Sequence, residues 1–320
     1  YTPQYLPLGI MDKSVEAWLK GAFKKGHLEQ GGLLMRGSLS GFPYRDNSGV
    51  FQFLGSAKDI DLHYAEGWPD VEQADAEVEV RNQSLHIQSG KASIAGNKIS
   101  HAVVAMQDRT QDDYLSITGR LDDNAAGLYT FFKQSPLNES LNDLMRYTQI
   151  QGLVGVDLDI QIPLHSALSP MVKATALLNN NTLLLPDIDL ALTQLTGVIS
   201  YGENGLTAKG LKASVLNESA LIDIASKQSS TVISLNGELD ARTLAKKYPH
   251  ELWRKISGRT PATLTVSVPL FSADDSADTT IKLESDLHGL LVDLPSPIGK
   301  VKTTKADFNA QLLLSPSDVP

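Results

Sequence analysis

Two short patterns in the sequence contain residue types that could perform hydrolytic chemistry. His250-Glu251 opens a string typical of zinc proteases, but Arg254 stands where the second histidine must be. Because both histidines are needed on one helix face to hold zinc, this motif is incomplete. Asp157 and Asp159 could act as a pair of glycosidase carboxylates, yet they occupy the polar positions of an alternating segment. We therefore interpret both aspartates as solvated surface residues.

Other signatures of catalysis or metal binding are missing from the sequence. It contains no cysteine, no glycine-rich phosphate loop and no Gly-x-Ser-x-Gly nucleophile motif. The seven histidines follow no ligand spacing. Asp274, Asp275 and Asp278 lack the glycine-bearing frame of a calcium loop. The sequence thus predicts a protein that is not an enzyme and holds neither a metal nor a cofactor.

Composition and charge narrow the class of protein further. Hydrophobic residues make up 42% of the 320 residues and charged residues 20%, which favours packed structure over disorder. The net charge of −9, without a compensating basic cluster, argues against nucleic acid and anionic membrane surfaces as partners. The densest basic pairs, Lys24-Lys25 and Lys246-Lys247, are expected at helix ends.

The ends of the sequence and its hydropathy bear on targeting. No run of 18 apolar residues is present, so we expect no membrane-spanning helix. The chain begins at Tyr1 without methionine and ends at Pro320, so we expect a segment of a longer protein. Targeting and anchoring sequences would then lie outside it.

Alternation of apolar and polar residues is the main structural signal. It predicts strands with one apolar and one polar face, which is typical of antiparallel sheets. The clearest segments are Val154–Ile162, Ala74–Val80, Ala262–Leu270, Ile281–Leu287 and Phe308–Leu314. The sequence therefore predicts a mainly β fold.

Helical periodicity is confined to short stretches. It predicts a helix over Val15–Phe23 that ends at Gly26, and a second helix that starts near Asn138. Shorter helices are expected over Ala125–Phe132, Arg242–Lys247 and Pro249–Ile256. So few helices cannot cover every apolar strand face. The sheet must pack as a sandwich, close into a barrel, or curl into a trough that a ligand fills.

Internal similarity suggests repeats of about 110–120 residues. Lys91-Ala92-Ser93-Ile94 recurs as Lys212-Ala213-Ser214-Val215, and Gly119-Arg120-Leu121-Asp122 as Gly237-Glu238-Leu239-Asp240. We expect one unit over residues 1–118, a second over 119–236 and a truncated third over 237–320.

Three phrases of the sequence carry a family resemblance. They are Ala17-Trp18-Leu19 with Gly31–Leu39 and Phe42-Pro43, then Leu62-His63-Tyr64 with Gly67-Trp68-Pro69, and Asp286–Leu290 with Leu294–Lys300. In this order they resemble the YhdP protein family, of the AsmA-like and TamB superfamily of Gram-negative bacteria. The resemblance implies a long, twisted antiparallel sheet, curled into an open hydrophobic groove with a few short helices.

The resemblance also implies a function. Such proteins bridge the periplasm between inner and outer membranes and support phospholipid transport, without catalytic residues. We expect phospholipid acyl chains as the ligand, contact with both membranes through parts beyond this chain, and a periplasmic segment of an inner-membrane-anchored protein. An alternative is a structural envelope scaffold with a dry β core, and an enzyme acting on envelope polysaccharide is a third interpretation.

A trough would place apolar strand positions against lipid tails. The residues expected to line it are Val156, Leu158, Ile160, Ile162, Leu264, Val266, Val268, Leu283 and Leu312. The alternative left open is that these side chains pack against a helix or a second sheet.

Overall fold

The computed structural model describes residues 17, 20–106, 114–136, 138, 148–164, 169–186, 189–227, 230–269 and 278–314. Within these ranges the chain forms 17 strands and a few short helices. It divides into two compact units, residues 1–139 with 154–175, and residues 140–153 with 176–320. The strands pair antiparallel into open sheet, so the predicted fold class is confirmed.

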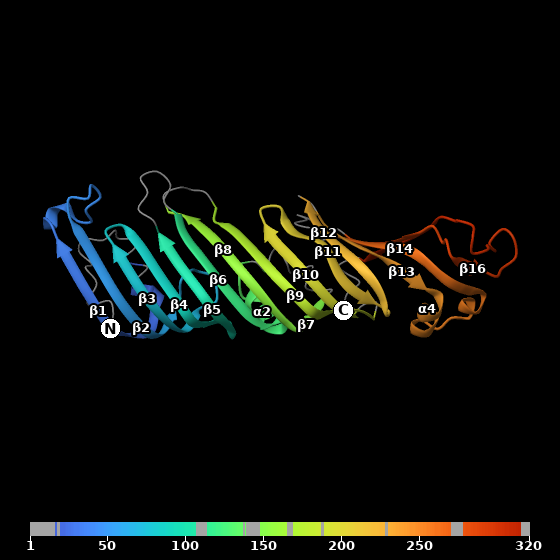
Figure 1. Cartoon of the computed structure of the whole chain (residues 1–320), viewed down its shortest axis with the longest axis horizontal. Helices are drawn as coiled ribbons and strands as arrows, with labels where there is room; N and C mark the ends of the chain where they lie inside the picture. The colour runs from blue at the N-terminus through green and yellow to red at the C-terminus, as the bar shows by residue number, and fades with distance from the viewer. Residues whose placement is uncertain are drawn as a thin grey trace. The chain divides into compact units, whose positions relative to one another are not determined.

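The first unit is built from consecutive antiparallel strands. Each strand from β1 to β6 pairs with the next one along the chain, and β8 lies beside β6 (Figure 1). The strands are β1 (Phe23–Arg36), β2 (Val50–Leu62), β3 (Val71–Arg81), β4 (Ser84–Ile94), β5 (Asn97–Met106), β6 (Tyr114–Asn124) and β8 (Leu153–Pro163). A 3-10 turn, η2 (Leu39–Gly41), follows β1.

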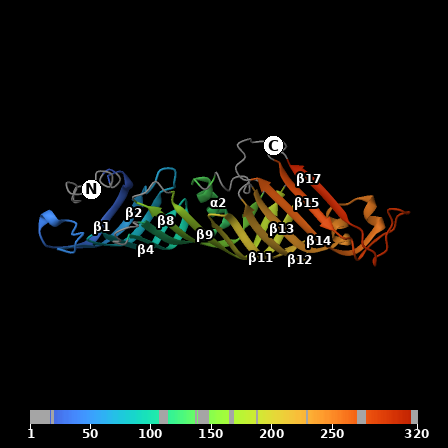
Figure 2. The ribbon, with the colours of Figure 1, turned by 90° about the horizontal axis from the view of Figure 1, so that it is seen from above.

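The second unit continues the same pattern. Its strands are β7 (Gln149–Gln151), most of β9 (Met171–Leu185), β10 (Leu190–Gly202), β11 (Gly205–Val215), β12 (Glu218–Lys227), β13 (Ser230–Asp240), β14 (Ile256–Pro269), β15 (Thr279–Ser285), β16 (Leu290–Val292) and β17 (Phe308–Leu314). Strand β14 pairs with β15 along one part and with β16 along another, and β17 pairs with β15. Figure 2 shows β14, β15 and β17 side by side.

Two of the predicted helices start where a polar side chain caps them. Helix α2 (Ala125–Lys133) begins after Asn124, whose side chain accepts a hydrogen bond from the amide of Ala126. Helix α4 (Ala241–Lys247) begins after Asp240, which caps the amide of Arg242, and it ends on Lys246 and Lys247 as predicted. The third expected helix is the 3-10 segment η4 (Glu251–Lys255).

The N-terminal helix prediction is wrong at its C-terminal end. Residues 20–22 are helical, but β1 starts at Phe23, so Lys24 and Lys25 lie in a strand and Gly26 is not a helix stop. Ladder pairing of Phe23 with Leu62 overrides the local helical spacing. Four of the nine residues of this helix, and all but the first residue of the helix expected from Asn138, lie outside the described residues.

Single-residue bulges interrupt the alternation in neighbouring strands of the first unit. Positions on this face of the sheet step by three rather than two in four strands, namely Ala57 to Ile60, Val71 to Ala74, Ser89 to Ala92 and Ile99 to Ala102. A bulge adds one residue, and it thereby keeps the following apolar residues on the same face. Ile60, Ala74, Ala76 and Ala92 are consequently packed together in one buried cluster.

The bulges depend on hydrogen bonds that their backbone amides donate to side chains of the adjacent strand. Asp59 and Gln73 both have a φ of 51°. The amide of Asp59 donates to Asp75 (3.3 Å), and the amide of Gln73 donates to Asp61 (3.0 Å). These carboxylates satisfy amides that the ladder leaves unpaired, so the bulges are built features of the sheet.

Two stretches share one order of elements. Strands β3 to β6 followed by α2 match strands β10 to β13 followed by α4, and the repeated tetrapeptides fall at equivalent places in them. The unit boundaries predicted at residues 118 and 236 stay a prediction.

Candidate functional site

Apolar side chains of the first unit form rows that run across its strands. Residues directly opposite each other in a ladder share a face of the sheet. One row consists of Leu33, Phe53, Val80, Leu85, Met106 and Leu115, and the next of Gly31, Gly55, Val78, Ile87, Val104 and Ile117. With strands spaced about 4.8 Å apart, each row of six extends for about 24 Å. We call the face that carries these rows the apolar face.

The second unit carries two comparable rows on its own apolar face. One consists of Ile224, Ile233, Val266, Ile281 and Leu312, and the other of Ile222, Leu235, Leu264, Leu283 and Ala310. Ile222 and Ile224 are buried, whereas Leu312 on β17 is 50% exposed. The rows therefore reach an exposed strand.

The apolar face is covered at one end of the strands and partly exposed at the other. Beyond the bulges, Leu121 of β6 is buried, together with Leu128 and Phe131 of α2. On the other side of the bulges, the first row is partly exposed, and Leu33 is 67% exposed. Isolated exposed apolar residues are ordinary, but contiguous exposed apolar rows mark binding surfaces.

The structure places the nine predicted lining residues as follows. Leu264, Val266, Val268, Leu283 and Leu312 lie on the apolar face of the second unit. Leu264 is directly opposite Leu283, and Ile281 stands between Val266 and Leu312 in one row. On β8, Asp157 forms an ion pair with Arg120 (3.0 Å) on the polar face of the sheet. Alternation therefore puts Val156, Leu158, Ile160 and Ile162 on the apolar face of the first unit. Val156 and Val268 are buried, and the other seven are partly or largely exposed.

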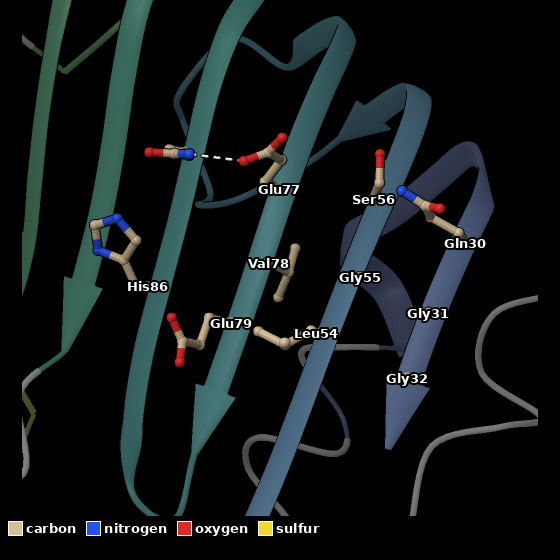
Figure 3. A pocket seen from close by; sticks show the side chains of 11 residues that line it. Gln30, Gly31, Gly32, Leu54, Gly55, Ser56, Glu77, Val78, Glu79 and His86 are labelled. Carbon is tan, nitrogen blue, oxygen red and sulfur yellow. Dashed lines mark hydrogen bonds between the residues drawn. The ribbon is translucent and has the colours of Figure 1, made fainter. Parts of the chain in front are cut away.

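The other face of the first unit is polar. Gln88 donates to Glu77 (2.7 Å) and Gln52 to Glu79 (3.1 Å), and these strands border an open hollow of about 430 Å³ (Figure 3). Further along, Arg120 binds Asp122 and Asp157, and its hydrogen bonds lower the pKa of Asp122. Asp157 is therefore held in an ion pair on the polar face.

The second resemblance phrase, Leu62–Tyr64 with Gly67–Pro69, forms a loop that packs against α2. His63 lies 2.7 Å from Asp70, which also pairs with Lys24 of β1. Trp68 packs against Tyr64 and against Phe131 of α2, with ring centroids 6.3 Å and 6.1 Å apart. The phrase thus anchors the covered end of the apolar face.

The third phrase folds around a lysine. Lys300 donates to the carbonyl oxygens of Leu287 (2.7 Å), Leu290 (2.8 Å) and Val301 (3.2 Å). Gly289 and Gly258 bring two backbones together, since a Cβ atom at Gly258 would lie 2.2 Å from the Gly289 carbonyl oxygen. The residues between β15 and β17 are therefore held by backbone contacts, and the phrase is structural.

Alternation alone does not mark the lining residues of β1 to β5. The bulges break the simple alternation there, and Gly31 and Gly55 interrupt the apolar pattern. The steps of three between apolar positions were the available signal.

No helix in the described ranges is long and apolar enough to cross a membrane. Within the same ranges, no three histidine or carboxylate side chains are grouped as a metal site would require.

An open antiparallel sheet with a partly exposed apolar face defines a protein of the β-groove class. The family model described as YhdP protein matches residues 1–317, and the chain belongs to this family. It is 25% identical over 301 residues to the intermembrane phospholipid transporter YhdP of Escherichia coli (strain K12). That alignment covers 93% of this chain and 24% of the relative, so the chain spans about a quarter of the relative's length. No solved structure matches it.

Proposed function

We propose that this chain is a periplasmic segment of a conduit that binds phospholipid acyl chains and supports phospholipid transport between inner and outer membranes. The family and the name of the relative support the lipid cargo. The inner-membrane anchor and the contacts with both membranes would belong to residues beyond this chain.

The observation that carries the proposal is the direction of the apolar rows. They cross the strands at right angles, so an elongated chain lying along a row passes from one strand to the next without meeting a charged side chain of that row. In the second unit, Val266 has Ile233 on one side and Ile281 on the other. The proposed lining comprises the nine residues predicted from the sequence and the rows of both units.

The hydrophobic effect is large enough for this task. At about 0.8 kcal/mol for each buried methylene, a 16-carbon tail contributes about 13 kcal/mol before entropy losses. An aliphatic lining holds no single strong hydrogen bond, so a tail can move along it without leaving a deep local minimum.

Photo-crosslinking tests whether tails lie on this face. A photoreactive amino acid at Val266 should crosslink to co-purified phospholipid, because its side chain is on the apolar face. The same group at Thr265 is the matched control, because Thr265 directly precedes Val266 in β14, lies on the other face and is also partly buried. Equal labelling at both positions, or none at Val266, would contradict acyl-chain binding here.

A charge at the same two positions separates the conduit from the dry scaffold. Val266→Asp should abolish lipid transfer and leave a folded chain if lipid wets the lining, and Thr265→Asp should preserve transfer. A dry core would instead unfold with Val266→Asp, because an unpaired buried charge is costly. Circular dichroism and a lipid-transfer assay read the two outcomes.

A further inference from the structure

Two glycines face each other on the apolar face of β1 and β2. Gly31 and Gly55 are directly opposite in the ladder, and they continue a row that holds Val78, Ile87 and Val104 in the next strands. Figure 3 shows both glycines on neighbouring strands. Neither has a positive φ, so the backbone itself would accept a side chain at either position.

The space above the two glycines is occupied by a ring and a leucine. A Cβ atom at Gly55 would lie 2.7 Å from Cζ of Phe53 and 3.2 Å from Cδ1 of Leu28. A Cβ atom at Gly31 would lie 3.1 Å from Cδ2 of Leu28 and 3.4 Å from Cε2 of Phe53. The far end of the Phe53 ring therefore leans along β2 over Gly55 and toward Gly31.

This posture is unusual for a strand side chain. Side chains on a sheet stand roughly perpendicular to it. Phe53 can lie low because no side chain rises from the position two residues further along its strand. A methyl group on Gly55 would overlap the ring, and the flexible ring would move before the backbone does.

We propose that Gly31 and Gly55 are positioning residues: because they lack side chains, the Phe53 ring can lie flat on the apolar face, and acyl chains can pass over β1 and β2. The inference rests on the proposed function. It adds a specific obstacle, because a raised Phe53 ring would stand in the row that also contains Leu33 and Val80.

A purely structural explanation is that the ring only shields the glycine backbone, as aromatic side chains do for strand glycines in designed sheets. In that case a substitution at Gly55 would alter stability, and lipid transfer would follow the amount of folded protein. The two explanations differ in what removal of the ring does.

The test compares Gly55→Ala, the double variant Gly55→Ala with Phe53→Ala, and the control Gly32→Ala. Gly32 is the neighbour of Gly31 on the other face, and no atom lies within 4 Å of a Cβ atom placed there. Transfer of labelled phospholipid between two vesicle populations is measured with the full protein that carries this chain. Crosslinking at Val266 reports lipid binding in the second unit.

The proposal expects Gly55→Ala to slow transfer by about tenfold, because the displaced Phe53 ring would obstruct the passage of acyl chains. The double variant should restore transfer, whereas Gly32→Ala and the crosslink at Val266 should stay unchanged. Normal transfer with folded Gly55→Ala, or no rescue by Phe53→Ala, overturns the role of the ring and leaves the conduit intact. Absence of the Val266 crosslink in the parent protein overturns the proposed function itself.

Discussion

At the residue scale, polar side chains in this protein serve the backbone and the sheet. Asp75 and Asp61 satisfy bulge amides, Asn124 caps a helix, and Lys300 is bound by three carbonyl oxygens. Asp75 also pairs with Lys58 (3.5 Å) and Lys91 (3.6 Å) across neighbouring strands. The fold thus gives these carboxylates a structural role, although carboxylates at such spacing suggest catalysis when the sequence is read alone.

Asp70 makes stability depend on pH in a defined direction. A hydrogen bond from Lys24, followed by the one with His63, lowers the pKa of Asp70 below its ordinary value of 3.8. A lowered pKa in the folded state stabilises the fold above the ordinary value, and this contribution is lost as pH falls through the folded-state pKa. We expect Asp70→Asn to lower stability by less than about 1 kcal/mol at pH 7, since the pair is near the surface.

Thermal unfolding of both proteins from pH 7 down to pH 2 measures this effect. The two unfolding temperatures should converge at the acidic end. Asp159→Asn on β8 controls for removal of one negative charge. A constant difference over the whole range would show that Asp70 acts by packing and not by its charge.

At the scale of elements, the bulges decide which residues share a face. Between Ala57 and Ile60 the extra residue carries Ile60 and Leu62 onto the face that holds Ala57. Strict alternation would have turned those two side chains to the polar face and put Asp61 among apolar residues. The buried cluster that separates the covered end from the exposed rows depends on this step.

Deletion of Asp59 tests the role of the bulge in β2. Removing one residue should keep Ile60 on the face of Ala57, because it restores simple alternation in β2. It removes the Asp59 amide that donates to Asp75, together with the local twist that the bulge imposes, so we expect the unit to lose about 1 kcal/mol of stability. Asp59→Gly keeps the chain length and suits the φ of 51°, so it should fold normally. Urea unfolding compares the two variants. A deletion variant as stable as Asp59→Gly would show that the bulge contributes nothing to stability.

At the scale of the whole molecule, each unit spreads its apolar surface across many strands. Ligand that binds only the folded state stabilises it by mass action, by about 2.7 kcal/mol at a concentration 100 times Kd. Under the proposed function, the partly exposed rows would supply this linkage in both units. The stability of the protein would then depend on its lipid load.

A thermal-shift experiment measures that dependence. A short-chain phosphatidylcholine should raise the unfolding temperature of delipidated protein, and Val266→Asp should reduce the rise. The headgroup alone, glycerophosphocholine, is the control and should have no effect, because it has no acyl chain. Equal shifts from both compounds would assign the binding to the headgroup.

The sequence by itself determined the kind of element and the two faces of most strands. Alternation in Val154–Ile162 and in Phe308–Leu314 predicts β8 and β17, and caps at Asn124 and Asp240 mark the starts of α2 and α4. These features are local, because a strand face or a helix start depends on residues within a few positions of each other. The three phrases that carry the family resemblance also consist of local turn and packing residues.

Only the tertiary structure decided where the bulges lie and which part of the apolar face is exposed. The bulge at Gln73 needs the carboxylate of Asp61 from the neighbouring strand. Phe23 became a strand residue because Leu62 pairs with it, against its helical spacing. Such partners are distant in sequence, and hydrophobic periodicity shows that a face is apolar without showing what covers it.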